Sequence, residues 1–198
     1  MGKTNYSLVV TTLNNDQTLA QCLSSVPGAS ELLVLDSGST DGTQAIAEQF
    51  NARWVQQPFR GYGPQKQDAI NLASYDWVLL LDADEALSPE LALEIDALME
   101  SEPEKKAYRL ARCEQLFWRW QSAATKYIHA VRLFHRQYAQ LGQGAVHAGL
   151  ETQAEVAQLT KPVMHRAETD LHSKVARINY YSSGMVQERV DDRVRFLK

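Results

Sequence analysis

The alternation of short apolar runs with helical patterns in the first half of the chain is the strongest constraint on its fold. The runs YSLVVTTL, ELLVLD, ARWVQQ and WVLLLD predict strands, because each is short and apolar. The segments DQTLAQCLSSV, TQAIAEQF and PQKQDAINLA predict helices between them. Consecutive strand and helix units of this kind form a mostly parallel sheet with helices on both faces. We therefore expect an α/β fold with one doubly wound, mostly parallel sheet and flanking helices.

Two of the predicted helices carry further signals. The first has an apolar stripe for packing on the sheet, formed by Leu19, Cys22, Leu23 and Val26. In the helix that follows WVLLLD, Ser88 is the predicted N-cap and Pro89 takes the first helical position. The start of that helix is therefore well defined by its sequence.

The second half of the chain has a looser pattern. From about Lys105 it contains the short runs AYRLAR, LFWRW, YIHAVRLFHR and VAQLTKPVMH, and a helix is predicted from about Ser173 to the end. No internal repeat, low-complexity stretch or linker-like composition indicates a second domain. We expect one domain over residues 1–198, with an elaborated C-terminal half.

Composition narrows the class of partner. The net charge of −4 and the absence of a concentrated basic run predict no nucleic-acid binding. Cys22 and Cys113 are far apart in sequence and predict reduced thiols in a cytoplasmic protein. The sequence lacks an apolar run of about 18 to 20 residues and a signal-peptide core, so neither a membrane span nor export is expected. Peripheral membrane contact stays open.

Polar residues follow several of the predicted strands. They are Thr11 to Asn14, Asp36 to Thr43, Gly61 to Lys66, and Asp82 to Asp84. Open α/β sheets bind ligands beyond the carboxyl ends of their strands, so we expect these stretches to meet at one edge of the sheet. In DSGSTDGT, Asp36 is expected to be free to accept hydrogen bonds from a base or ribose. A strand-to-helix turn made of favourable turn residues is the alternative for this stretch.

The acids Asp82, Asp84 and Glu85 close the most apolar predicted strand. Three carboxylates this close repel one another unless water, a cation or a cationic ligand compensates them, and we expect a metal ion and a diphosphate to do so. On an extended segment Asp82 and Asp84 share one face, with Ala83 opposite. Such carboxylates suit Mg²⁺ or Mn²⁺, although acids after a strand are also common at protein surfaces.

Other residues permit both functional and structural interpretations. GYGPQK lacks the third glycine of the dinucleotide fingerprint; Pro64 is expected to open a helix from which Lys66 reaches a phosphate, unless Lys66 is simply solvated. The histidines show no zinc-site spacing, but His147 and His165 follow strand-like runs, from which a ring can reach the crevice. The aromatic cluster can stack on a sugar, anchor at a bilayer surface or pack in the core. Its members are Phe117, Trp118 and Trp120.

The ordered combination SLVVTTLNN, VLDSGSTDGT, GYGPQK, WVLLLDADE and VRLFHR followed by VH resembles the family 2 glycosyltransferases. It is similar in particular to bacterial lipopolysaccharide inner-core glucosyltransferases, from about Ser7 to His172. The resemblance implies a GT-A fold, a nucleotide-sugar donor that is usually UDP-linked, and a divalent Mg or Mn ion. It also implies inverting transfer to a hydroxyl of a glycan or lipid-linked saccharide such as the lipopolysaccharide core. A cytoplasmic location is implied, with the inner face of the cytoplasmic membrane left open.

The same resemblance assigns roles to individual residues. Residues 1–100 would form the nucleotide-sugar half and residues 101–198 the acceptor half. Asp36 would meet the uracil, Asp82 the ribose, and Asp84, together with Asp82, the metal. The remaining residues implied near the donor are Thr12, Leu13, Asn14, Lys66, Ala83 and Arg132. His147 corresponds to the histidine of the family's Val-His-Glu.

Three departures from the family pattern change what we expect. Asn15 stands where the family most often has Glu, and Ala148 replaces the Glu that would be the general base. We expect Glu151, supported by His147, to replace that base, because residues four apart share a face in either a helix or a strand. The chain ends at Lys198 while close relatives continue, so we expect the acceptor side to be incomplete.

Two alternatives to a sugar transferase stay open. The first is a non-catalytic nucleotide-sugar-binding relative that has lost its base at Ala148. The second is an aspartate-nucleophile phosphatase, with Asp191 and Asp192 as its acidic pair. The phosphatase pattern expects Thr or Val after the DxD, whereas Glu85 and Ala86 follow here. Neither the sugar, the acceptor nor the oligomeric state follows from the sequence.

Overall fold

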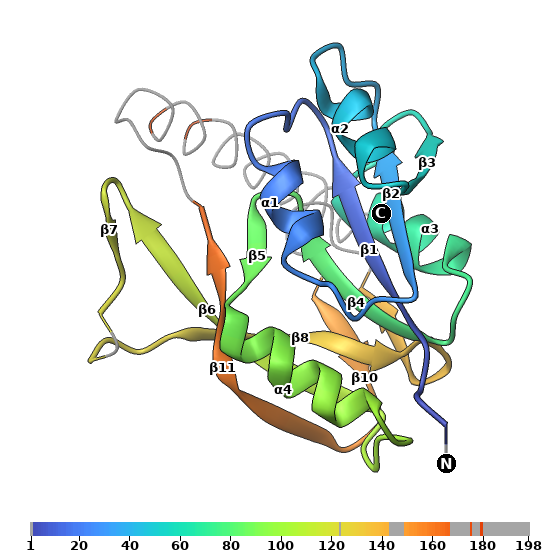
Figure 1. The fold of residues 1–198 in the computed structure, drawn as a ribbon, viewed down its shortest axis with the longest axis vertical. Coiled ribbons are helices and arrows are strands. Elements are labelled where there is room, and N and C mark those ends of the chain that lie inside the picture. The colour runs from blue at the N-terminus through green and yellow to red at the C-terminus, as the bar shows by residue number, and fades with distance from the viewer. Residues whose placement is uncertain (1, 123, 143–148, 167–174, 176–178, 180–198) are drawn as a thin grey trace, which may run out of the picture.

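The computed structural model of the protein describes residues 2–122, 124–142, 149–166, 175 and 179 (Figure 1). The helix predicted from about Ser173 falls almost entirely outside the described residues, as do His147, Ala148 and the Asp191–Asp192 pair. Within the described part of the chain, no helix has the length and hydropathy needed to cross a membrane.

The predicted strands and helices of the first half are confirmed in order. They are β1 (Tyr6–Thr12), α1 (Leu19–Ser24), β2 (Glu31–Asp36), α2 (Thr43–Gln49), β3 (Arg53–Gln56), α3 (Tyr62–Leu72) and β4 (Trp77–Asp82). Two helices differ in their bounds. α1 spans Leu19–Ser24, shorter at both ends than the predicted 16–26. α3 begins at Tyr62, two residues before Pro64, because Gly61 adopts a φ of 106° and turns the chain into the helix.

The second half continues the same sheet. Its elements are β5 (Glu85–Leu87), α4 (Pro89–Met99), β6 (Ala107–Leu116), β7 (Arg119–Trp120), β8 (Ile128–His135), the 3₁₀ turn η1 (Arg136–Tyr138), β9 (Ala139–Leu141), β10 (Leu150–Thr152) and β11 (Val156–His165). The strand order is β3-β2-β1-β4-β8-β6-β11-β5, with β7 paired to β6, while β9 and β10 form a separate two-stranded sheet.

Strand direction changes halfway across the main sheet. The pairs β3–β2, β2–β1 and β1–β4 are parallel, whereas β8 is antiparallel to both β4 and β6. β11 runs parallel to β6, and β5 closes the edge antiparallel to β11. The sheet is therefore mixed but mostly parallel, as expected.

Apolar cores on the two faces of the sheet hold the helices. Alternate β1 residues serve opposite faces: Leu8 and Val10 belong to one core and Val9 to the other. The Leu8 core includes buried residues of α1, α2 and α4, and the Val9 core includes those of α3. The predicted α1 stripe is buried as expected. The Ser88 hydroxyl caps α4 by accepting a 3.2 Å hydrogen bond from the Leu91 N–H.

The strand register positions a site. Thr12 pairs with Asp36, and Thr11 pairs with Asp82, so the carboxyl ends of β1, β2 and β4 lie side by side. In Figure 1 these ends point toward the top of the view. The polar stretches that follow the strands are thereby gathered at one edge, as the sequence predicted.

Candidate active site

The DxD segment does not continue β4. The strand ends at Asp82, residues 83 and 84 form a turn, and β5 starts at Glu85. Our expectation that Asp82 and Asp84 share one face of an extended segment is therefore wrong, because the turn redirects the chain between them. Ala83 is buried in the core at this turn. The two aspartates instead meet different partners.

Asp82 is held between two cationic side chains. Its Oδ1 forms an ion pair with the Lys66 ammonium group from α3, and its Oδ2 lies 3.3 Å from the Arg132 guanidinium from β8. Burial raises the pKa of Asp82, but Lys66 and Arg132 outweigh burial and hold this pKa well below its usual range. Lys66 is thus an ion-pair partner in this structure, and not a solvated surface residue.

Glu85 is the most buried of the three acids, with a fully buried side chain. Its Oε1 lies 2.8 Å from Arg132 and 3.8 Å from Arg112 of β6. Its Oε2 accepts a 3.0 Å hydrogen bond from the Asp82 N–H. Burial raises the pKa of Glu85, and the negative charge of Asp82 adds to this effect. Glu85 is therefore a structural acid that fixes the turn and anchors the arginines.

Asp84 contacts a histidine. Its Oδ2 lies 3.2 Å from Nε2 of His165 at the end of β11, and Nδ1 of His165 lies 2.5 Å from Oε2 of Glu114 on β6. Burial alone would lower the pKa of His165, but the two carboxylates raise it to about 9. Glu114 also lies 2.6 Å from Arg112 as an ion pair. His165, one of the two histidines expected to reach the crevice, does so.

The cluster is balanced in charge. Its acids are Asp82, Asp84, Glu85 and Glu114, and its cations are Lys66, Arg112, Arg132 and protonated His165. Side chains of the protein, rather than a metal ion and a diphosphate alone, therefore compensate the repulsion that the sequence predicted. The reason is tertiary: β6, β8, β11 and α3 bring cations to the acids from distant parts of the sequence.

A divalent cation fits part of this cluster. Among the described residues, no group of three or more His, Cys, Asp and Glu side chains is arranged to hold a metal. Mg²⁺, however, commonly binds through one or two carboxylates plus substrate phosphates. Asp84 supplies such a carboxylate. Nε2 of His165 lies beside it and would become a ligand only by losing the proton that it holds in the metal-free protein, while Glu114 accepts from the second ring nitrogen, as carboxylates near metal-bound histidines usually do. Asp82 is committed to Lys66 and Arg132, so it fits this role less well.

The loops after β1 and β2 are joined by hydrogen bonds. The Asn14 N–H donates to the Ser39 hydroxyl at 2.8 Å, and the Asn14 side-chain oxygen accepts from the Thr40 N–H at 2.9 Å. Thr12 donates to the Asn15 side chain at 2.9 Å. Leu13 is left half exposed at this edge. Thr12, Leu13 and Asn14 therefore lie together at this edge, tied to the loop after β2, and their contact with a nucleotide stays a prediction.

Asp36 is not free in this structure. It is fully buried, and its Oδ2 accepts hydrogen bonds from the N–H groups of Gly38 and Ser39, both at 2.8 Å. Its Oδ1 accepts from the Ser39 hydroxyl at 2.5 Å. The carboxylate thus forms the strand-to-helix turn that was the alternative interpretation. Base recognition by Asp36 stays a prediction, and it requires the loop after β2 to move so that a base can reach the buried carboxylate.

Of the proposed general base and its supporting histidine, the structure describes only Glu151. Glu151 is exposed on β10 and pairs with Gln140 of β9. β9 is attached to α3, since the Leu141 N–H donates to the Gln67 side chain at 2.9 Å, one residue from Lys66. His147 and Ala148 lie outside the described residues. The catalytic role of Glu151 and His147 therefore stays a prediction.

Two members of the cluster, Arg112 and Glu114, were not predicted from the sequence. They lie in the loosely patterned half, on β6, where each is partly buried next to a buried neighbour. The sequence run RLARCE does place a basic and an acidic residue on a predicted strand. The two residues are two positions apart, so they lie on the same face of a strand, and this spacing could have indicated that they act together.

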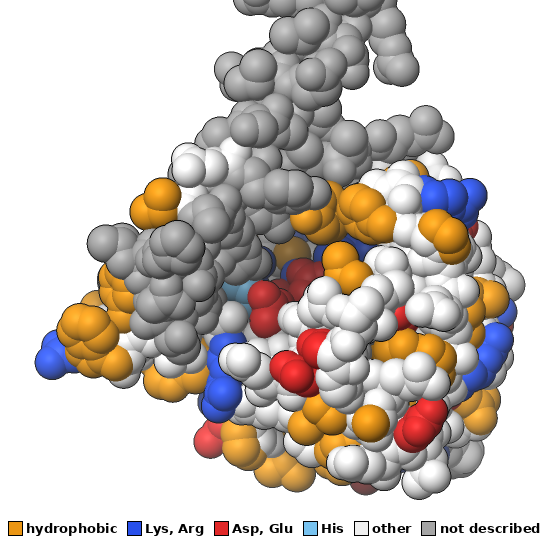
Figure 2. All heavy atoms as spheres, turned by 90° about the horizontal axis from the view of Figure 1, so that it is seen from above, with side chains coloured by type: hydrophobic (Ala, Val, Ile, Leu, Met, Phe, Trp, Pro, Cys, Tyr) orange, Lys and Arg blue, Asp and Glu red, His pale blue; other side chains and the backbone are white. Residues whose placement is uncertain are grey.

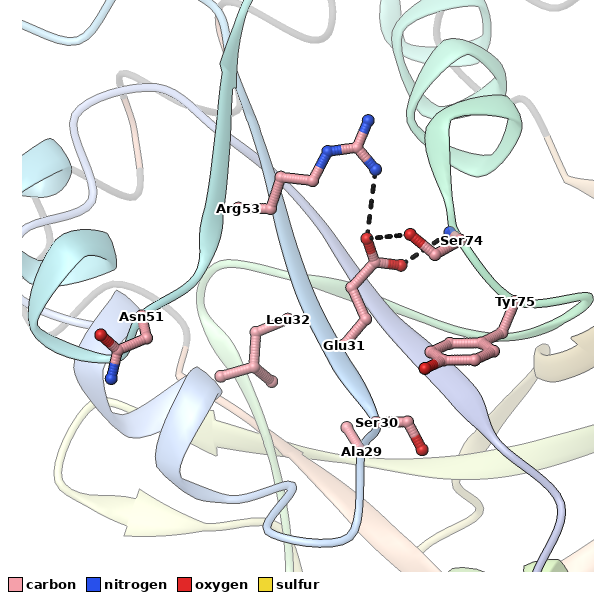
Figure 3. A pocket seen from close by; sticks show the side chains of 8 residues that line it. All are labelled: Ala29, Ser30, Glu31, Leu32, Asn51, Arg53, Ser74 and Tyr75. Atoms are coloured by element: carbon pink, nitrogen blue, oxygen red, sulfur yellow. Dashed lines mark hydrogen bonds and ion pairs between the residues drawn. The ribbon is translucent and has the colours of Figure 1, made fainter.

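Figure 2 shows acidic and histidine side chains inside a hollow at this end of the molecule, with basic side chains behind them. Two other hollows lie at the opposite end of the sheet. One, of about 380 Å³, is lined by residues that include Glu31, Arg53 and Ser74 (Figure 3). The second, of about 510 Å³, is lined by residues that include Trp77 and His135. Neither of these two contains a residue of the acidic cluster.

Sequence comparisons agree on one enzyme family. A family model described as "Glycosyl transferase family 2" matches residues 7–147. The lipopolysaccharide core biosynthesis glycosyltransferase LpsC of Rhizobium meliloti (strain 1021) is 28% identical over 202 residues, which cover 97% of this chain and 75% of LpsC. An uncharacterized glycosyltransferase of Rickettsia felis is 28% identical over 198 residues, covering 93% of this chain and 70% of that protein.

Solved structures share the fold. S. aureus TarS 1-349 superposes with a TM-score of 0.61 at 15% identity, covering 82% of this chain and 60% of that chain. Its complex with UDP-GlcNAc gives a TM-score of 0.57 at 15% identity, covering 86% of this chain and 61% of that chain. This similarity shows the GT-A fold and, at such identity, the fold alone.

Proposed function

Because the chain belongs to glycosyl transferase family 2, we propose that it transfers a sugar from a UDP-linked donor to a hydroxyl of a lipopolysaccharide-core or related glycan acceptor. It is a glycosyltransferase by family; the donor, the acceptor and inversion at the anomeric carbon are parts of the proposal. One observation carries it: the Asp84–His165 pair and the Lys66–Asp82 pair lie together at the carboxyl ends of the strands. That edge is where open α/β sheets bind ligands.

The donor assignment is supported by the walls of the crevice and by relatives. Thr12, Leu13 and Asn14 would line the nucleotide, Asp36 would accept from the uracil, and Asp82 would meet the ribose. TarS has been solved with UDP-GlcNAc, and the relative LpsC is named for lipopolysaccharide core biosynthesis. The second of these names supports the proposal of a glycan or lipid-linked saccharide acceptor.

Asp84 and His165 would hold a divalent Mg or Mn ion, which supplies charge neutralisation at the departing diphosphate. Lys66 and Arg132 add fixed positive charge beside the same position. Glu151 would take the proton of the acceptor hydroxyl. The hydroxyl oxygen then bonds to the anomeric carbon while the bond to the diphosphate oxygen breaks, so the configuration inverts.

A cytoplasmic location is part of the proposal. Among the described residues, Cys22 and Cys113 are buried free thiols, which fits a reducing compartment. The phosphatase alternative loses its support, because the family match covers the DxD segment itself.

The test is a screen of nucleotide sugars with and without Mn²⁺, in which thermal stability and nucleoside diphosphate release are measured. A bound donor raises the apparent melting temperature. We expect a UDP-sugar with Mn²⁺ to give the largest rise and to release UDP when acceptor is added. Failure of every nucleotide sugar to raise the melting temperature or to be turned over would overturn the proposal.

Asp84→Asn is the matching variant, with the exposed Glu90→Gln of α4 as its control. Metal-dependent donor binding should be lost in Asp84→Asn and kept in the control. Repulsion among the three acids, taken alone, would make neutralising one of them harmless or stabilising. The largely buried ion pair between Asp84 and His165 reverses that expectation, and we expect a destabilisation of roughly 1 to 3 kcal/mol.

A further inference from the structure

The β6–β7 hairpin and the first residue of β8 carry apolar side chains that are exposed to water. Trp118 is 82% exposed, Ile128 is 59% exposed and Trp120 is 42% exposed. With Phe117, Arg119 and Lys126, these residues form what we call the hairpin patch. Large aromatic side chains are costly to leave in water, and Trp prefers the boundary between water and an apolar phase. The core packing considered for these aromatics therefore does not apply to the two tryptophans.

The β6–β7 hairpin is held in place by strand pairing and side-chain hydrogen bonds. Gln115 pairs with Trp120 across the two strands, and the Gln115 side chain donates to the Phe117 carbonyl at 3.0 Å. Phe117 adopts a φ of 55°, so the tip is held in a left-handed turn, and its ring lies 5.8 Å from that of Trp118. Figure 1 shows the hairpin projecting from the sheet on the side away from α2 and α3.

The hairpin patch is basic, although the whole chain has a net charge of −4. Its two charged residues, Arg119 and Lys126, are both basic, and the sequence has no Asp or Glu between Glu114 and Glu151. Arg119 and Lys126 are exposed, and no ion pair among the described residues involves either of them. Figure 2 shows apolar and basic side chains together at the edge where this hairpin projects.

We propose that the hairpin patch docks the protein on an anionic lipid bilayer, with Trp118 and Trp120 inserted at the interface and Arg119 and Lys126 facing the headgroups. Trp side chains favour the membrane interface, and each basic residue near an anionic surface adds attraction to the headgroups. The charge excess selects an anionic surface over a neutral one. Docking goes beyond the transfer reaction and does not depend on it.

A chain of contacts joins the hairpin patch to the catalytic edge. The Gln121 N–H donates to the Glu114 carbonyl at 2.8 Å, and the Glu114 N–H donates to the Gln121 side chain at 3.2 Å. Glu114 contacts His165, and His165 contacts Asp84. Because these contacts tie the hairpin to the catalytic edge, docking would hold that edge close to the membrane surface. Only this consequence, access to a lipid-linked acceptor, rests on the proposed function.

The experiment is vesicle flotation of the full chain without donor or acceptor. Vesicles of phosphatidylglycerol mixed with phosphatidylethanolamine are compared with pure phosphatidylcholine, at low and high salt. We expect binding to the anionic vesicles, weakened by salt, and quenching of tryptophan fluorescence by brominated lipid. No binding to anionic vesicles at low salt would overturn the proposal.

Two double variants separate the contributions. Trp118→Ser with Trp120→Ser should weaken vesicle binding at least about tenfold and remove the quenching. Arg119→Gln with Lys126→Gln should weaken binding to anionic vesicles about fivefold per charge and should remove the salt dependence. Leu93→Ser, which removes a 70% exposed apolar residue from α4, is the matched control and should change nothing.

Folding of each variant is checked by UDP affinity and thermal melting, neither of which the exposed substitutions should alter. Unchanged vesicle binding in the tryptophan double variant would overturn the proposal. If those substitutions leave vesicle binding intact but weaken the binding of a soluble saccharide acceptor, the proposal is also overturned, since the tryptophans would then stack on the glycan. Loss of vesicle binding with full UDP affinity supports the proposal, whatever the transfer assay shows.

Discussion

Nε2 of His165 lies 3.2 Å from Oδ2 of Asp84, although the two residues are 81 positions apart in the sequence. The sheet register explains the contact: His165 is the last residue of β11 and pairs with Glu85 on one side and Glu114 on the other. Asp84 precedes Glu85 directly. The order β6-β11-β5 therefore places one imidazole between two carboxylates, at the position where the proposed metal and diphosphate would bind.

We predict that His165→Gln weakens metal-dependent UDP binding by at least about tenfold, because the metal would lose the nitrogen ligand that lies beside Asp84. Calorimetric titration of UDP in the presence of Mn²⁺, and again in its absence, measures the effect. The exposed His129→Gln is the control and should bind as the unchanged protein does. Equal Mn²⁺-dependent affinity in both variants would remove His165 from the site.

Asp36→Asn should weaken uridine nucleotides more than other nucleoside diphosphates, because an amide cannot offer two acceptor oxygens to the uracil N–H and the loop together. Asn is chosen over Ala because Asp36 also holds the turn through Gly38 and Ser39, and Ala would leave those N–H groups without an acceptor. Competition binding with UDP, GDP and ADP measures the selectivity. Asp41→Asn in the same loop is the control. A uniform loss across the nucleotides would make Asp36 a turn residue only.

Glu151→Gln should leave donor affinity intact and reduce transfer by roughly 10² to 10⁴, because a neutral amide cannot take the acceptor proton. Steady-state transfer rates and UDP affinity are measured side by side. Glu155→Gln, an exposed acid a few residues along the chain, should retain activity. Retained turnover in Glu151→Gln would exclude it as the base. An inactive unchanged protein that gains activity in Ala148→Glu would instead favour the non-catalytic alternative.

Glu31 gives a pH prediction at the far end of the sheet. Its carboxylate accepts a hydrogen bond from the Ser7 hydroxyl. It also accepts hydrogen bonds from the N–H and hydroxyl of Ser74 and from Arg53, which Figure 3 shows. Burial raises the pKa of Glu31, but these hydrogen bonds outweigh burial and lower it below its ordinary 4.5. A lowered folded pKa contributes stability that is fully present above the unfolded pKa and is lost as the pH falls through the folded value.

Glu31→Gln should therefore reduce the free energy of unfolding by about 1 kcal/mol near neutral pH. The difference from the unchanged protein should shrink as the pH falls below about 4.5. Urea unfolding measured at several pH values gives both quantities. The exposed Glu100→Gln should show neither effect. A difference that stays constant across this range would mean that the ionised carboxylate contributes nothing.

The sequence by itself determined the first half of the fold. β1, β2 and β4 are almost completely buried, so their apolar runs stand out without knowledge of their neighbours. The start of helix α4 was predictable because Ser88 is a favourable N-cap residue. Parallel strands connected by helices place their carboxyl ends at one edge, so the polar stretches after them were predictable as one site.

Only the tertiary structure decided what surrounds the DxD acids. The first residues of β8 are exposed, so the sequence of this strand did not predict that Arg132 contacts Asp82 and Glu85. Arg112 and Glu114 are partly buried, and neither shows in the sequence that it will meet His165 or Glu85. Compensation of charge depends on which strands become neighbours, and that order is set by packing over the whole sheet. A sequence specifies where charges occur, whereas the fold specifies which charges meet.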